Sequence, residues 1–441
     1  ALLLKDKLAK LPADIRKAFE TDPEERSAFQ EDLLKKNAAL IAVSPKATTA
    51  AMNADDLSLW KSRSQAMTAV KQRSPQTIPV ATGMTDTGAQ APAVFLLRRG
   101  NFKDPREQVP PGFLSVLSDR KQIDSAPPAD SPTSGRRKAL AEWLTRPEHP
   151  LTARVLVNRL WQNHFGRGIV ATPSDFGNQG AAPTHPELLD WLATELIARS
   201  WSMKAMHRLM VTSATYRQSS KASAKALAED PDNTLFSRMY RRRLEGEAVR
   251  DALLSASGHL DRRIGGASVF PDLPPGVETR GGWTRSASSA DRNRRSIYVF
   301  VRRNLKYPLF DAFDFPDTNV TCPERNVSVN APQALMLLNS ELVLEEARAL
   351  AGRVLVCAGQ GTDACELIRQ AYRLALSRTP SAEETERGVK FLQEQASSLN
   401  PGPKPQDLPT PLPEGRDSAQ AAALVDFCHV LVNLNEFVFV D

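Results

Sequence analysis

Apolar residues recur three and four positions apart through most of this chain, and that spacing is the strongest constraint on its fold. Between residues 151 and 164, Val155, Leu156, Leu160 and Trp161 form an apolar stripe at this spacing. An α-helix turns once in about 3.6 residues, so these positions share one face that must be buried. Similar segments follow one another along the chain, and stretches rich in Pro, Gly and Ser separate them. The pattern predicts a mainly α fold: a bundle-like domain of many helices with long loops.

Changes in composition divide the chain into five predicted parts. The first ten residues hold too short an apolar stretch for a secretion signal, so we interpret the chain as starting inside a longer protein. The largest part is predicted to be a helical core that includes an arginine-rich loop region at 261–330. The parts are a helical N-terminal segment (1–73), a linker with a short strand (74–133), the helical core domain (134–399), a Pro-rich linker (400–415) and a C-terminal helix that packs back on the core (416–441).

Local signals refine this outline. Thr184 and Glu187 have the spacing of a capping box, in which each side chain bonds the backbone amide of the other residue. Gly166 follows the helix at 151–164 and is expected to end it. Two apolar runs, at 93–97 and 297–301, are predicted to be buried strands that form one small β-sheet.

The positive charge is concentrated in one stretch. Residues 231–310 contain 15 Lys and Arg residues, 14 of them Arg, against 8 Asp and Glu residues. We interpret most of these arginines as partners in internal salt bridges or as a solvated face. The competing hypothesis is a surface for an anionic ligand, because a planar guanidinium binds carboxylate, sulfate or phosphate through paired hydrogen bonds.

The anionic-ligand hypothesis assigns specific residues. Trp283 and Tyr298 would stack on sugar rings while arginines meet acidic substituents. The alternative for Trp283 is that it anchors its loop to the core. The ligand-binding candidates are Arg167, Trp283, Arg292, Arg294, Arg295 and Arg325.

Strong catalytic signatures are absent from the sequence. It contains no HExxH, GxSxG, GxGxxG or GxxxxGK[ST] motif, and an isolated Asp-Phe-Gly triplet at 175–177 carries no weight without the rest of a kinase signature. None of the six histidines lies three or four positions from another, and the four cysteines form neither CxxC nor CxxCH. We therefore predict no metal site and no cofactor.

Four residues are the candidates for catalysis if the chain is an enzyme. His164 and Asp175 fall between a helix end and a loop, and Asp311 and Asp314 lie among aromatic residues. Two carboxyl groups in one cleft would suit glycoside hydrolysis. The competing interpretation of each is structural, with the aspartates paired to nearby arginines such as Arg325.

Nucleic acid and membrane are not expected as partners. The basic run at Arg241–Arg243 is followed by Glu245, Glu247 and Asp251, which can neutralise it. No apolar run approaches the length of about 18 residues that a membrane-spanning helix needs.

Long motifs in the chain resemble a known family. They are "HPLTARVLVNRLWQNHFGRGIVATPSDFGNQG", "DPDNTLFSRMYRRRLEGEAVRDALLSASGHLD", "RRSIYVFVRRN", "APQALMLLNSELV" and "VLVNLNEFVFVD". They resemble the C-terminal domain of unknown function (domain fifteen fifty-three) found in planctomycete and verrucomicrobial proteins that also carry a planctomycete cytochrome c domain. Upstream, "FLLRRGNFKDPREQVPPGFLSVL" fits the region that precedes this domain.

The resemblance implies a setting but no reaction. Proteins of this family are exported, so an extracytoplasmic location, periplasmic or secreted, is expected, with polysaccharide degradation as the context. It supplies no catalytic residues. Three hypotheses remain open: a binding or scaffolding domain that engages anionic polysaccharide, a hydrolase or redox-associated enzyme acting on polysaccharide, and a docking domain for a cytochrome c domain or a neighbouring protein. We favour the first.

Overall fold

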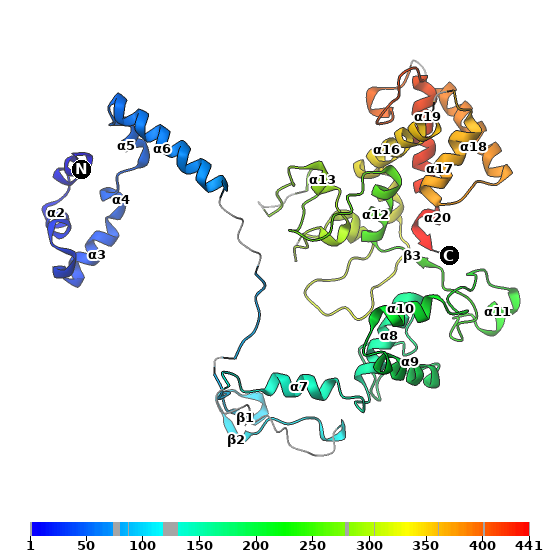
Figure 1. Ribbon diagram of the computed structural model, residues 1–441, viewed down its shortest axis with the longest axis horizontal. Helices are drawn as coiled ribbons and strands as arrows, with labels where there is room; N and C mark the ends of the chain where they lie inside the picture. Colours follow the sequence, from blue (N-terminus) through cyan, green and yellow to red (C-terminus); the bar gives the residue numbers. More distant parts are fainter. Residues whose placement is uncertain are drawn as a thin grey trace. The chain divides into compact units, whose positions relative to one another are not determined.

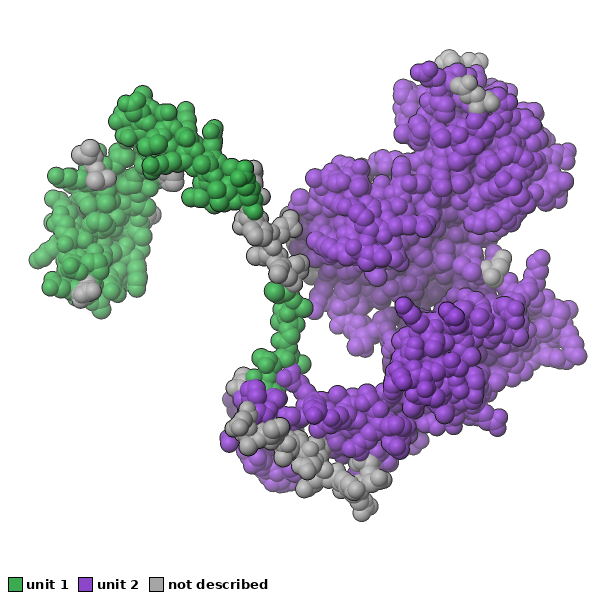
Figure 2. Space-filling model, viewed as in Figure 1, with its two compact units in different colours: residues 1–87 green, residues 88–441 purple. Residues whose placement is uncertain are grey.

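The computed structural model describes residues 2–73, 80–86, 88–117, 131–277, 282–303, 305–359, 361–399 and 402–440. Two compact units make up the chain, Ala1–Thr87 and Gly88–Asp441 (Figure 2). Helices dominate both units (Figure 1), and the strands among the described residues form two sheets of two strands each. The predicted mainly α class is therefore confirmed.

The first unit consists of short helices. Ile15 and Ala18 are its buried apolar side chains among the residues described there. Ser27 and Gln30 form a capping box at the start of α3, with Gln30 N donating to Ser27 Oγ at 3.3 Å. Its helices are α1 (Leu2–Ala9), α2 (Ala13–Glu20), α3 (Ala28–Lys36), α4 (Ala38–Ile41), α5 (Pro45–Ala50) and α6 (Ala54–Arg73), with a 3-10 turn at Pro23–Glu25.

The second unit begins with an exposed hairpin. β1 (Val94–Leu97) pairs antiparallel with β2 (Pro105–Val109) around a 3-10 turn at Arg98–Gly100. A strand does form where the run at 93–97 predicted one, but all four of its residues are exposed. The prediction of a buried strand was wrong because a two-stranded hairpin offers no second layer to cover an apolar strand.

The segment at 297–301 does not join that hairpin. It begins in a 3-10 turn, Ser296–Tyr298, and Val299 makes one isolated bridge with Val269. Val269 N donates to Tyr298 O at 2.8 Å and Val269 O accepts from Phe300 N at 2.9 Å. The prediction of one sheet from the segments near Phe95 and Val299 was wrong. Val269 alone forms the backbone hydrogen bonds to Tyr298 and Phe300, which flank Val299.

A first core cluster forms around α8 (Thr152–Phe165), α9 (Pro186–Ala198) and α10 (Met203–Val211). Gly166 ends α8 with a φ of 85°, as predicted. The predicted capping box at α9 was wrong: His185 occupies the cap position without a side-chain bond, and the Thr184 hydroxyl donates to Ile169 O instead. The buried side chains of this cluster include Val157, Leu160, Phe165, Leu192, Leu196 and Met206.

A second, larger core cluster forms around α16 (Glu341–Ala358), which packs against α12, α17 and α19 (Figure 1). Its buried side chains include Val343, Leu350, Val354, Ile368 and Leu424. The second sheet pairs β3 (Arg242–Arg243) with β4 (Phe439–Val440) and so ties the chain end to the start of α12. The remaining elements are α7 (Arg136–Leu144), α11 (Ala224–Glu229), α12 (Gly246–Ser257), α13 (Ser289–Arg292), α14 (Pro308–Ala312), α15 (Ala331–Asn339), α17 (Ala364–Leu376), α18 (Ala382–Ser398), α19 (Ser418–Val432), α20 (Asn435–Val438) and 3-10 turns at Ser115–Leu117 and Pro405–Asp407.

The Pro-rich segment at 402–416 lies directly on α16. Thr410 N donates to Arg348 O at 3.1 Å, and Arg348 Nε donates to Leu408 O at 2.8 Å. Gly352 makes this close approach possible, because a Cβ at that position would lie 2.6 Å from the carbonyl carbon and oxygen of Thr410. The absence of a side chain at one helical position thus decides where this segment packs.

Gly352→Ala should therefore destabilise the second unit. The new methyl group meets backbone rather than a flexible side chain, and forced overpacking costs about 1–3 kcal/mol. Gly112→Ala is the matched control, since nothing lies within 4 Å of a Cβ there. Urea unfolding followed by circular dichroism should show a lower midpoint for Gly352→Ala and an unchanged one for Gly112→Ala. Equal midpoints for both variants would show that the segment does not pack on α16.

Candidate ligand-binding cleft

The segment after α12 has little regular structure, and arginine side chains hold it in place. We call residues 258–277 and 282–303 the arginine loop. Buried backbone carbonyls need hydrogen-bond donors, and an irregular segment has no ladder of its own to supply them. Arg294, with 5% of its surface exposed, donates to the carbonyls of Arg263, Gly265 and Ala267, and its guanidinium stacks 3.8 Å from the ring centre of Tyr298.

Arg250 attaches the arginine loop to α12. Its surface is 1% exposed, and its guanidinium donates to the carbonyls of Arg292 and Arg294 and to the Ser296 hydroxyl. The neighbouring Asp251 accepts from Ser296 N at 2.7 Å. One turn of α12 therefore fixes the loop through both a buried cation and a carboxylate.

A cleft of about 1200 Å³ opens between the arginine loop, α15 and α16. Much of its lining is apolar, with Leu273, Pro274, Leu335, Met336 and Leu342 among the residues that surround it. Charged and titratable groups are interspersed with them. Those are Arg250, His259, Asp272, Arg285, Arg292, Glu341, Glu345, Glu346 and Arg348.

A histidine–carboxylate pair lies in this cleft. His259 Nδ1 and Glu346 Oε2 are 2.9 Å apart; the His259 side chain is 43% exposed, and that of Glu346 is 5% exposed. The hydrogen bond to Glu346 raises the pKa of His259 above its ordinary value, partial burial opposes that rise, and the charges of Glu346 and Glu345 add to it. Because Nδ1 faces the carboxylate, the neutral imidazole carries its proton there and leaves Nε2 as the acceptor.

The pKa of Glu345 is shifted upward, the opposite direction to that of a carboxylate in a salt bridge. Partial burial in the cleft wall raises the pKa of Glu345, and the nearby carboxylates of Glu346, Asp272 and Glu341 raise it further. The cleft therefore combines a base of raised affinity for protons with a carboxyl group that holds its proton more strongly than usual. Titratable groups with perturbed pKa values in an open cleft are typical of functional sites.

Neither residue of this pair is marked by a sequence motif. His259 and Glu346 lie 87 positions apart, His259 at the start of the arginine loop and Glu346 on α16. The one usable signal was the length of the irregular segment that follows His259, since long loops often line functional sites.

Several predicted ligand-binding residues lie in or near the arginine loop. Trp283 is 8% exposed, and its indole donates to Pro271 O at 2.9 Å while packing near Phe270. This is the anchoring role that was the alternative to sugar stacking. Arg292 lines the cleft but is engaged by Asp272 at 2.9 Å and by the carbonyls of Ser286 and Ala287.

Arg294 and Arg295 have opposite environments. Arg294 is buried and bonded to the loop backbone, as described above, whereas Arg295 is exposed. Among the predicted arginines of the loop, Arg295 is thus the exposed one. Arg292 and Arg294 donate to backbone carbonyls of the loop, whereas Arg263 and Arg285 pair with aspartates.

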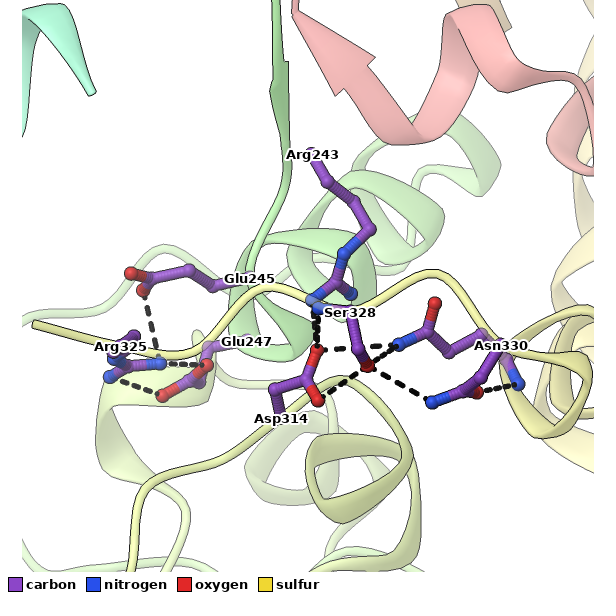
Figure 3. Close-up of polar contacts among 8 residues, drawn as sticks. Arg243, Glu245, Glu247, Asp314, Arg325, Ser328 and Asn330 are labelled. Atoms are coloured by element: carbon purple, nitrogen blue, oxygen red, sulfur yellow. Dashed lines mark hydrogen bonds and ion pairs between the residues drawn. The ribbon is translucent and has the colours of Figure 1, made fainter. Parts of the chain in front are cut away.

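Asp314 and Arg325 lie in a polar network beside β3 (Figure 3). Asp314 accepts from Arg243 Nη2 at 2.6 Å and from the hydroxyl and backbone amide of Ser328 at 2.7 and 2.9 Å. Burial alone would raise the pKa of Asp314, but the hydrogen bonds from Ser328 and the charge of Arg243 hold it below its usual range. Arg325 binds both carboxylate oxygens of Glu247 at 2.9 Å and also pairs with Glu245.

The other catalytic candidates have local partners. Asp311 pairs with Lys306 at 3.1 Å, and Asp175 accepts from Gly177 N in its own turn. His164 Nε2 lies 2.8 Å from His207 Nδ1; partial burial lowers the pKa of His164, and the charges of His207 and Arg242 lower it further. No hydrogen bond or ion pair in the described part of the chain joins these three candidates to one another or to Asp314.

Arg167 lies beside the hydroxyl of Tyr240, away from the arginine loop in sequence.

Within the described ranges no cluster of three or more His, Cys, Asp or Glu residues could hold a metal ion, and no helix there could span a membrane. All four cysteines are free thiols; Cys428 is buried, and that burial raises its pKa.

Comparison with known proteins identifies the family. Residues 136–392 match PSD1, a protein family of unknown function (DUF1553). The match covers more than half of the chain, so the chain belongs to this family, and the predicted resemblance to a domain of unknown function is confirmed. The comparison with curated proteins found no match, and the comparison with solved structures found none.

Asp311 lies in α14 and Asp314 lies just after its end, and the two aspartates together test the polar network around Asp314. Asp314→Asn should lower the stability of the second unit by about 3 kcal/mol, because it leaves the Arg243 cation, whose side chain is 4% exposed, without a charged partner. Asp311→Asn should cost less than about 1 kcal/mol, because the Asp311 side chain is 60% exposed. Urea unfolding of the two variants measures the difference. Similar losses would mean that Asp314 is not the charge partner of Arg243.

Proposed function

We propose that this chain is an extracytoplasmic binding module and that its ligand, a polysaccharide chain, enters the cleft between the arginine loop and α16. The cleft itself is the observation that carries the proposal. At about 1200 Å³ it exceeds the size of ordinary small-molecule sites, and its lining combines apolar side chains with charged and polar groups. Sugar rings present both apolar faces and hydroxyl groups, so this lining suits them.

Acidic substituents of the polymer would meet Arg285. The side chains of Arg285 and Asp272 are 60% and 59% exposed, and they pair with each other at the cleft. An exposed pair of this kind contributes at most about 1 kcal/mol, so a sulfate or carboxylate of the ligand can replace Asp272 at small cost. The buried arginines cannot do this, because the loop backbone already engages them.

The setting of the module is part of the proposal. The resemblance to exported planctomycete proteins that carry cytochrome c domains supports an extracytoplasmic location and a place in polysaccharide degradation. It also supports a cytochrome c domain of the same longer polypeptide as a neighbour.

Binding should depend on the cleft lining and on Arg285. Leu335→Asp places a charge on the apolar wall and Arg285→Ala removes the exposed cation, so each should weaken binding to sulfated polysaccharide about tenfold, a loss of about 1.4 kcal/mol. Added salt should weaken wild-type binding more than that of Arg285→Ala, because salt screens exposed charges. Isothermal calorimetry with neutral and sulfated polysaccharides measures both effects.

Matched controls lie close by. Leu338→Asp changes a 49% exposed leucine of the same helix that does not line the cleft, and Arg262→Ala removes an exposed arginine outside it. Both controls should bind as the wild type does. Equal weakening by the control variants would place the ligand elsewhere, and the absence of binding to any polysaccharide would contradict the proposed ligand class.

A further inference from the structure

We propose that the cleft is also catalytic: His259, oriented by Glu346, is the general base that hydrolyses a carboxylic ester carried by the bound ligand. The proposal rests on the proposed function for the polymer that bears the ester. The hydrolytic step rests on the geometry of the pair alone and can be measured with a small ester.

His259 has the two contacts that a catalytic base requires. One ring nitrogen must be held by an orienting group, and the other must be open to the reacting molecule. Glu346 holds Nδ1 at 2.9 Å from a nearly fully buried position on α16. Nε2 makes no hydrogen bond in the described part of the chain, and the His259 side chain, which is 43% exposed, is one of the groups that line the cleft.

The backbone explains why the imidazole lies at this edge. Gly258 ends α12 with a φ of 91°, and the chain turns there so that His259 leaves the helix. Arg353 packs beneath the turn and donates to the carbonyls of Ser255 and Ala256 at 2.8 Å. Asp261 N then donates to Asn293 O at 3.0 Å, which brings Asn293, another cleft residue, close to the His259 segment.

The reaction follows from these positions. Nε2 of His259 takes a proton from water as the water oxygen forms a bond to the ester carbonyl carbon. Glu346 stabilises the imidazolium that results, and the side-chain amide of Asn293 can donate to the oxyanion. Collapse of the tetrahedral adduct breaks the bond to the alcohol oxygen, which takes the proton from Nε2. The products are a carboxylic acid and an alcohol, and His259 is neutral again.

An ester fits the site better than a glycosidic bond. Glycoside hydrolysis places two carboxyl groups on either side of the bond, one of them the proton donor. Here Glu346 is committed to His259, Glu345 is its neighbour on the same helix, and Asp272 of the arginine loop is paired with Arg285 and Arg292. A single oriented imidazole is sufficient for an ester, whose alcohol leaves with the proton that water supplied.

The test uses the full chain with p-nitrophenyl acetate as the probe. The wild type should show saturable hydrolysis, and His259→Gln should reduce kcat/KM about 100-fold, within the usual contribution of a general base. The glutamine amide can still donate to Glu346, so the variant keeps the pair's hydrogen bond. His207→Gln is the matched control for the weak reactivity of any exposed imidazole, and it should hydrolyse the ester as the wild type does.

The pH profile separates a catalytic role from a structural one. The rate should rise with pH as His259 loses its proton, with a midpoint above the ordinary histidine value of about 6.5. Glu346→Gln removes the charge that raises the pKa of His259, so its midpoint should move to lower pH. A rate that is unchanged in His259→Gln, or a profile that Glu346→Gln leaves in place, would overturn the proposal.

Binding and acetate-release assays with acetylated xylan distinguish failure of the catalytic proposal from failure of the proposed function. Release of acetate from xylan that binds supports both proposals. Binding without release of acetate, together with no His259-dependent hydrolysis of the small ester, overturns the catalytic proposal and leaves the binding module. Hydrolysis of p-nitrophenyl acetate that depends on His259, without binding to any polymer, supports the catalytic site and overturns the polysaccharide assignment.

Discussion

The rest of the site depends on the hydrogen bonds that the buried guanidinium group of Arg250 donates to the arginine loop. An irregular segment of about forty residues cannot pack against a core unless its carbonyl groups find donors, because an unpaired buried polar group costs about as much as a lost hydrogen bond. Arg250 and Arg294 together supply donors to five loop carbonyls. Arginine suits this task because its rigid guanidinium group carries five donors and keeps its charge even when it is buried.

The cleft follows from this arrangement. α12 fixes the arginine loop in place. The cleft lies between this loop and α16, and prolines, leucines and charged residues line it. α16 also packs against α17 and α19 and carries the Pro-rich segment over Gly352, so its position is fixed from several sides (Figure 1). Glu346 thus projects from a rigid helix, and a rigid helix can orient an imidazole better than a loop can.

Sequence periodicity predicted the helices well because the burial of one apolar face is a local property. The same reasoning failed for the runs at 93–97 and 297–301, where apolar residues form an exposed hairpin and a 3-10 turn. Whether a short apolar run is buried depends on partners distant in sequence, and spacing carries no information about them. The Thr184 box failed for a similar reason, since the backbone places His185 rather than Thr184 at the cap position.

The candidate site was harder to predict than the fold. The arginine excess was interpreted as internal salt bridges or a solvated face, but the sequence could not show that the buried Arg250 and Arg294 bind backbone carbonyls. The aspartates were expected to pair with nearby arginines such as Arg325, but Asp314 pairs with Arg243, and Arg325 binds Glu245 and Glu247. His259 and Glu346 were not recognised at all. Nothing local marks the latter two, because the loop fold alone brings them together.

The most direct measurement is the titration of the His259 ring protons by NMR in the full chain, assigned by their loss in His259→Gln. The account predicts a pKa above the ordinary value of about 6.5 for His259 in the wild type, because the buried carboxylate of Glu346 holds its imidazolium form. It also predicts that this pKa falls in Glu346→Gln. A His259 that titrates at or below 6.5 and does not respond to Glu346→Gln would contradict the oriented pair and, with it, the cleft as the functional site.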